Sequence, residues 1–207
     1  MIQYPLKQKD IHQKETFMAK DYYKIPIVLG EKNFKDYIKF DVLTRQKRYK
    51  KSLTLFLAFY ISATLCFALQ DTVEVAFVFG SIFVVAAVFI PTNFFRTFTN
   101  SMNEQTKKMK LSPPREVYTI HLSSRKNGIS LDYPDEKKIA AEFTWQDALG
   151  AWKTKNAIYL YVTDTQALLI PMNNPTLDYD GIWGFIKSNL PLDKLHEENS
   201  RFPFFMK

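Results

Sequence analysis

The sequence predicts an α-helical membrane hairpin joined to an α+β domain that faces water. Three features predict this class: two long blocks without charge, a short acidic connector between them, and a downstream region in which apolar residues alternate. The chain has 207 residues and a formal net charge of +7. Its charged residues lie outside the two blocks, so the average composition hides a sharp partition.

The two uncharged blocks cover residues 52–70 and 75–95. A helix needs about 20 mainly apolar residues to cross the hydrocarbon core of a bilayer. Two buried helices of a soluble protein are the alternative, but such helices usually keep charges on one face. We therefore expect a two-helix transmembrane hairpin over residues 52–95.

The distribution of cations predicts the orientation of the hairpin. The connector carries Asp71 and Glu74 but no Lys or Arg, whereas both flanks are basic. The positive-inside rule then places both termini in the cytoplasm of a multi-pass cell-membrane protein. Because the N-terminus has no apolar core ahead of its first charges, we expect no signal peptide there.

Polar residues within the hairpin are few, and no ionisable pair crosses its centre, where a pump or relay would be expected to carry a functional charge. Small residues such as Ala63, Gly80 and Ala87 favour close packing of the helices. We expect a membrane anchor. The alternative is an oligomeric channel or transporter subunit.

Residues 31–51 read as a basic pre-membrane helix, and residues 96–114 as a linker. Anionic lipid headgroups attract such cations, so the candidate contacts are Lys47, Arg48, Lys50 and Lys51. A basic run beside a membrane helix can also act only as a topology determinant. Nucleic acid favours clustered cations too, but the position of this run argues against it and we expect no nucleic acid partner.

The region at residues 115–172 alternates with period two and predicts six short antiparallel strands in meander order. Asn127 and Gly128 tolerate positive φ and predict a hairpin turn. An amphipathic helix follows at residues 178–190, and a tail at residues 192–207. A small curled sheet closed by a helix would result.

An additional strand is expected at residues 23–29, within an N-terminal arm of residues 1–30. Pro26 would place it at a sheet edge. Because the hairpin returns the chain to the same side, we expect this strand to pair with the sheet of residues 115–172. An unpaired apolar strand would be an association hazard.

Several stretches resemble the YcxB-like family of bacterial two-helix membrane proteins: residues 33–40, 143–145, 156–162 and 167–171. The resemblance covers residues 22–190 approximately. It implies a pleckstrin-homology-like (PH-like) cytoplasmic domain at residues 115–191, with six or seven antiparallel strands and a C-terminal helix. It implies no settled activity.

The sequence contains no pattern typical of a catalytic centre. His12, His121 and His196 are far apart, and the only cysteine, Cys66, lies in the first uncharged block. Neither metal-ligand spacing nor a glycine-rich phosphate loop is present. We therefore expect no enzyme, no cofactor and no metal.

Tyr159 and Tyr161 are the candidate partner-binding surface. They alternate with Ile158 and Leu160, so we expect their rings to be partly exposed on the opposite face of the strand. Most aromatic residues of this region would be core, although a ligand groove is an alternative. The expected function is a binding or scaffolding module at the inner face of the membrane, with a peptide, a protein or a second copy as partner.

Overall fold

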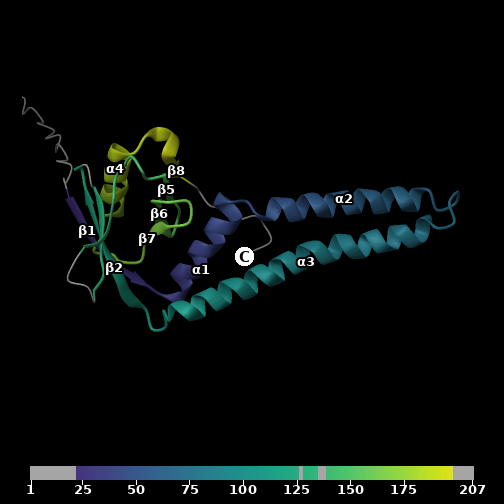
Figure 1. Ribbon diagram of the computed structural model, residues 1–207, viewed down its shortest axis with the longest axis horizontal. Coiled ribbons are helices and arrows are strands. Elements are labelled where there is room, and N and C mark those ends of the chain that lie inside the picture. The colour runs from purple at the N-terminus through teal and green to yellow at the C-terminus, as the bar shows by residue number, and fades with distance from the viewer. Residues whose placement is uncertain (1–21, 126–127, 135–138, 198–207) are drawn as a thin grey trace, which may run out of the picture.

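The computed structural model describes residues 22–125, 128–134 and 139–197. Figure 1 shows two long helices that run side by side and project from a β-rich domain. That domain contains two sheets and the helix α4 (Tyr179–Asn189). The N-terminal strand and the C-terminal elements both belong to it.

The long helices are α2 (Tyr49–Ala68) and α3 (Ala76–Met109), and both are long and apolar enough to cross a membrane. Most of their large apolar side chains are exposed. Close packing occurs at small residues: Ala63, Gly80 and Ala87 are buried, and a Cβ at Gly80 would lie only 2.9 Å from Phe67 Cε1.

Helix α3 is longer than expected. It has 34 residues against 20 in α2, which corresponds to about 51 Å against about 30 Å. The predicted linker at residues 96–114 is therefore mainly helix, up to Met109. The extension of α3 is stabilised by packing beside α1 (Glu31–Lys39). This part of α3 buries the side chains of Met102 and Thr106.

The first sheet has the order β1-β2-β3-β4. Its strands are β1 (Tyr22–Leu29), β2 (Arg115–Ser123), β3 (Ile129–Asp132) and β4 (Ile139–Phe143). Strand β1 lies at the edge and pairs antiparallel with β2, as predicted. Ile25, Ile27 and Leu29 point into the core. The whole helical hairpin is thus an insertion between two adjacent strands.

The second sheet has the order β7-β6-β5-β8. It contains β5 (Gly150–Lys153), β6 (Ala157–Tyr161), β7 (Ala167–Pro171) and the short parallel strand β8 (Leu195–Glu197). The described residues therefore form two four-stranded sheets rather than one curled sheet, and no closed barrel. The chain changes sheet at the turn after β4, and β8 uses residues assigned to the tail.

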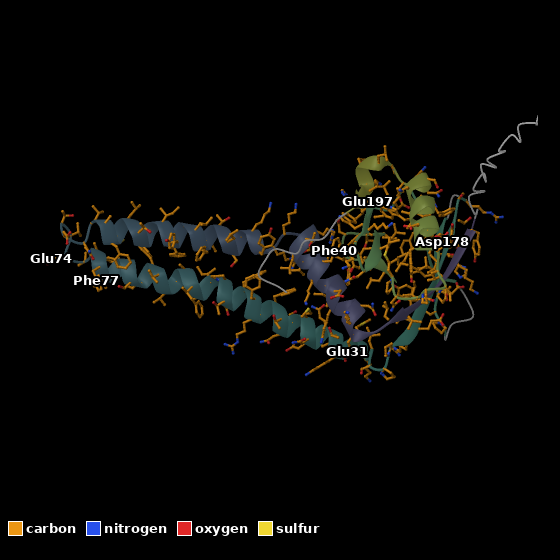
Figure 2. The ribbon with its side chains drawn as sticks, turned by 180° about the vertical axis from the view of Figure 1, so that it is seen from behind. Glu31, Phe40, Glu74, Phe77, Asp178 and Glu197 are labelled. Carbon is orange, nitrogen blue, oxygen red and sulfur yellow. The ribbon has the colours of Figure 1, made fainter. Side chains whose placement is uncertain are left out.

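The pre-membrane segment is interrupted rather than continuous. Helix α1 passes into a π-helical segment, η1 (Phe40–Arg45), and α2 begins only at Tyr49. Lys47 adopts a left-handed backbone with φ of 50°, which costs a non-glycine residue roughly 1–2 kcal/mol. The break lets α1 and η1 follow the second sheet while α2 follows α3. Figure 2 shows Phe40 at the junction between the domain and the hairpin.

Candidate functional site

Helix α1 and segment η1 cover one face of the second sheet. The Phe40 ring stacks on the Tyr159 ring at 4.6 Å between centroids, with an interplanar angle of 23°. Tyr37 lies 5.7 Å from Tyr159, and Phe40 lies edge-on to Trp152 at 6.4 Å. Aromatic contacts of this kind stabilise packing beyond the buried area. The pre-membrane segment is therefore part of the domain's core.

The predicted exposure of Tyr159 and Tyr161 is wrong, because their relative exposures are 3% and 0%. The alternation along β6 correctly separated two faces of the strand, but both faces are covered. The second face carries the helix that precedes the hairpin. The aromatic stripe of that helix was visible in the sequence, yet nothing local showed which strand it would cover.

A polar network joins η1 to β6 beside these rings. Asp41 accepts hydrogen bonds from Arg45 Nε at 2.6 Å, Gln46 Nε2 at 2.5 Å and Tyr161 Oη at 2.8 Å. The Arg45 guanidinium lies 4.3 Å from the centroid of the Tyr161 ring. Arg45 also donates to the carbonyl of Asp164 at 2.8 Å. One carboxylate therefore organises three donors from two separate parts of the chain.

Burial and the nearby Asp41 carboxylate raise the pKa of Tyr161 far above its ordinary value. Burial alone would lower the pKa of Arg45, but its hydrogen bond to Asp41 and the charge of that carboxylate outweigh burial and raise it. Tyr161 therefore remains a protonated donor and Arg45 a cation near neutral pH.

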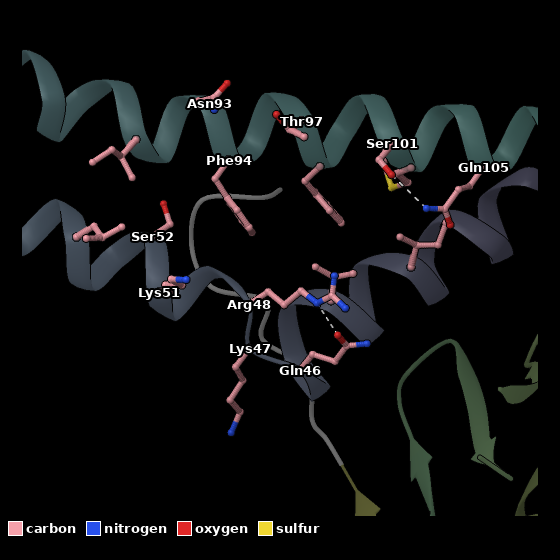
Figure 3. A pocket seen from close by; sticks show the side chains of 16 residues that line it. Gln46, Lys47, Arg48, Lys51, Ser52, Asn93, Phe94, Thr97, Ser101 and Gln105 are labelled. Carbon is pink, nitrogen blue, oxygen red and sulfur yellow. Dashed lines mark hydrogen bonds between the residues drawn. The ribbon is translucent and has the colours of Figure 1, made fainter. Parts of the chain in front are cut away.

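A cavity of about 830 Å³ lies at the base of the hairpin. Figure 3 shows it between α3, the start of α2 and the segment that precedes α2. Its lining residues come from all these elements: Ile38, Val42, Gln46, Lys47, Arg48, Lys51, Ser52, Leu55, Ile90, Asn93, Phe94, Thr97, Phe98, Ser101, Met102 and Gln105. This set contains three cations and no carboxylate.

The structure places Lys47, Arg48 and Lys51 in the lining but not Lys50. The Lys47 side chain points away from α3, whereas Arg48 extends toward Gln46 (Figure 3). Arg48 Nε donates to Gln46 Oε1 at 2.5 Å, and Gln46 in turn donates to Asp41. A chain of hydrogen bonds thus runs from the cavity to Tyr161 in the second sheet.

A second polar cluster crosses the first sheet. His121 Nε2 lies 2.7 Å from Asp132 Oδ2, and the Tyr22 hydroxyl is hydrogen-bonded to His121 Nδ1. The order carboxylate, imidazole, hydroxyl is that of a general-base relay. However, Tyr22 is 50% exposed, and none of the three residues lines the large cavity. The sequence did not reveal this cluster because it depends on the pairing of three strands.

Among the residues that the structure describes, no group of three His, Cys, Asp or Glu side chains is placed to hold a metal ion. Comparison of the chain with family models, curated proteins and solved structures finds no match. The resemblance to YcxB-like proteins therefore stays a prediction.

Proposed function

We propose that the chain is an integral protein of the cell membrane that holds a PH-like binding or scaffolding module at the cytoplasmic face. Its partner would be a protein, a peptide or a second copy. The observation that carries this proposal is the pairing of β1 with β2 across the inserted hairpin. A helical hairpin that crosses a bilayer twice returns to its starting side, where these two strands can meet.

The cation distribution supports a cytoplasmic position for both ends. Lys and Arg flank α2 and α3 at the domain end of the hairpin, and the turn at residues 71–74 has only acidic charges. Positive charge is retained on the cytoplasmic side during insertion.

The order of elements supports the PH-like fold and the YcxB-like family. Strands β1 to β4 and strands β5 to β7 each pair in meander order within their own sheet, with the hairpin inserted between β1 and β2, and the amphipathic helix α4 comes next. Strand β8 is an addition to that arrangement, since it joins the sheet in parallel.

Four hydroxyls of the hairpin support an anchor rather than a conducting path. Thr64 and Ser81 donate hydrogen bonds to the carbonyls of Tyr60 and Phe77, four residues earlier in their own helices. Thr54 and Thr92 do the same. Hydroxyls bonded in this way can face lipid without water or a partner chain.

A non-enzymatic role agrees with the position of the Tyr22–His121–Asp132 cluster. Its Tyr22 ring is half exposed, and none of its three residues lines the large cavity, whereas catalytic groups usually line a cavity that excludes water. We assign it to strand pairing.

Three measurements on the full-length chain test the proposal: cross-linking in its native membranes, its mass in detergent, and its conductance in planar bilayers. We expect cross-links from the β-rich domain to a partner and no conductance. A homo-oligomer that conducts ions would contradict the proposal and favour the channel alternative.

A further inference from the structure

We propose that the cavity at the base of the hairpin binds one anionic phospholipid. Its phosphate would lie at Arg48 and Lys51, and an acyl chain would lie along α3. This inference rests on the proposed membrane function and deepens it by naming a ligand for a defined site.

The charge of the lining favours an anion. Arg48 and Lys51 belong to it, together with Lys47, whose side chain points away from α3, and no Asp or Glu does. Arg48 presents a guanidinium, whose fork of N–H donors matches the oxygens of a phosphate. Gln46 holds that guanidinium through Nε at 2.5 Å, and two further guanidinium nitrogens remain that can donate to a phosphate.

The apolar part of the lining favours a lipid over a free phosphate. Leu55 and Ile90 lie on the bilayer side of the cations, and Phe94 and Phe98 continue the wall along α3. A soluble anion would leave this wall in contact with water. An acyl chain would cover it, and burial of apolar surface is favourable.

The level of the cavity favours access from the bilayer. Lys51 precedes the turn of the hairpin by about as many residues as Phe94 follows it, so both lie near the end of the apolar stretch. The lining continues from there to Gln105 on α3 and Ile38 on α1. A lipid could therefore enter sideways with its headgroup at the interface and its tail in the membrane.

The volume is also suitable. About 830 Å³ falls within the range of roughly 300–1,000 Å³ that is typical of small-molecule sites. Such a space holds a glycerophosphate headgroup with part of one chain, while the rest of the lipid remains in the bilayer.

Native mass spectrometry of the full-length, delipidated chain in detergent tests the proposal. Phosphatidylglycerol and phosphatidylcholine with identical acyl chains are added separately, and glycerol 1-phosphate serves as the lipid-free anion. We expect one phosphatidylglycerol per chain, bound at least about tenfold more tightly than phosphatidylcholine. Glycerol 1-phosphate at equal concentration should not displace it.

Paired charge variants show whether the cavity is the site. The double variant Arg48→Gln, Lys51→Gln removes two cations from the lining, whereas Lys50→Gln, Lys107→Gln removes two nearby cations outside it. We expect at least about a tenfold loss of affinity in the first and less than about a twofold change in the second. Equal losses would overturn the proposal, because they would show general attraction to a basic surface.

Paired volume variants test the apolar wall. Thr97→Trp would place a large ring in part of the cavity, and Thr99→Trp adds the same ring at an exposed position of α3 outside the lining. We expect weaker lipid binding only with Thr97→Trp. Thermal unfolding of each variant is the control for correct folding. Equal lipid binding by the Thr97→Trp and Thr99→Trp variants would overturn the proposal.

Two further outcomes would overturn it: equal affinity for both lipids, and binding that appears only after deletion of residues 198–207. The second would identify the chain's own tail as the occupant. Failure of the lipid site leaves the proposed binding module intact if the domain still cross-links to a partner. Conversely, a chain that binds lipid but cross-links to no partner would contradict the proposed binding module and support the lipid site.

Discussion

Tyr161 donates a hydrogen bond to Asp41 over 2.8 Å, although 120 positions separate the two residues in the chain. Asp41 precedes the long helices and Tyr161 follows them. The bond therefore ties the pre-membrane segment to the second sheet, while the pairing of β1 with β2 closes the first sheet. The domain is attached at two places to the same end of the hairpin. A movement of η1 would therefore displace both α2 and β6.

Asp41→Asn should destabilise this junction. The substitution leaves the half-buried Arg45 without its counter-charge and weakens the acceptor for Tyr161. Hydrogen bonds to charged groups are worth roughly 1.5–3 kcal/mol each, so we expect a loss of about 2 kcal/mol in the free energy of unfolding. Trp fluorescence during chemical unfolding measures it, because the Trp152 ring lies 5.0 Å from Tyr161. Asp36→Asn on α1 is the control, with an expected change below about 0.5 kcal/mol.

Phe40→Ala should release α1 and η1 from the sheet. The side chain is 2% exposed, and truncation of a buried phenylalanine costs about 3–5 kcal/mol. Limited trypsin digestion should then cut sooner within the basic run at residues 47–51. Phe40→Leu keeps most of the apolar volume and should show a smaller change. If both variants resist trypsin as well as the wild type, the aromatic stack does not hold the segment in place.

Local patterns were sufficient to predict the hairpin, most strands and α4, because each rests on a periodicity read along one segment. The pairing of β1 was also predictable, since the hairpin leaves an apolar strand and a sheet on the same side. The burial of Tyr159 was not. It depends on a helix more than 100 positions earlier, and alternation within β6 shows only that two faces exist.

The cavity shows the same limit. Arg48 and Lys51 were recognisable as cations at a membrane edge, but the break at Lys47 and the extension of α3 to Met109 were not. Both features result from packing, because α1 packs on the second sheet whereas α2 packs on α3. Lys47, with its left-handed backbone, joins the different directions of α1 and α2. Without these features, the sequence cannot show that Lys50 lies outside the cavity.

Alkaline pH should destabilise the fold, and Tyr161 should contribute. Burial raises the pKa of Tyr161 in the folded chain, whereas an unfolded tyrosine titrates near pH 10. The folded state thus keeps a proton that the unfolded state loses, so this stabilisation is complete below about pH 10 and falls as pH rises above it. The Tyr161→Phe variant should be less stable than the wild type at pH 8. Its free energy of unfolding should decline less steeply between about pH 10 and 12. Parallel pH profiles for variant and wild type would contradict this assignment.

Loss of β1 should unfold the domain even though β1 lies at the far end of the chain from β5–β8. Ile25, Ile27 and Leu29 are buried in one core with residues of both sheets. Ile25→Ala should cost about 2–5 kcal/mol, since Ile25 is fully buried. Lys24→Ala, at the neighbouring exposed position of the same strand, should change stability by less than about 0.5 kcal/mol.

Deletion of residues 1–30 removes all three core side chains and leaves the β2 edge unpaired, so we expect rapid proteolysis of the β-rich domain in the truncated chain. A truncated chain as resistant as the full-length protein would show that β1 adds no stability and that the hairpin is not held closed by this pairing.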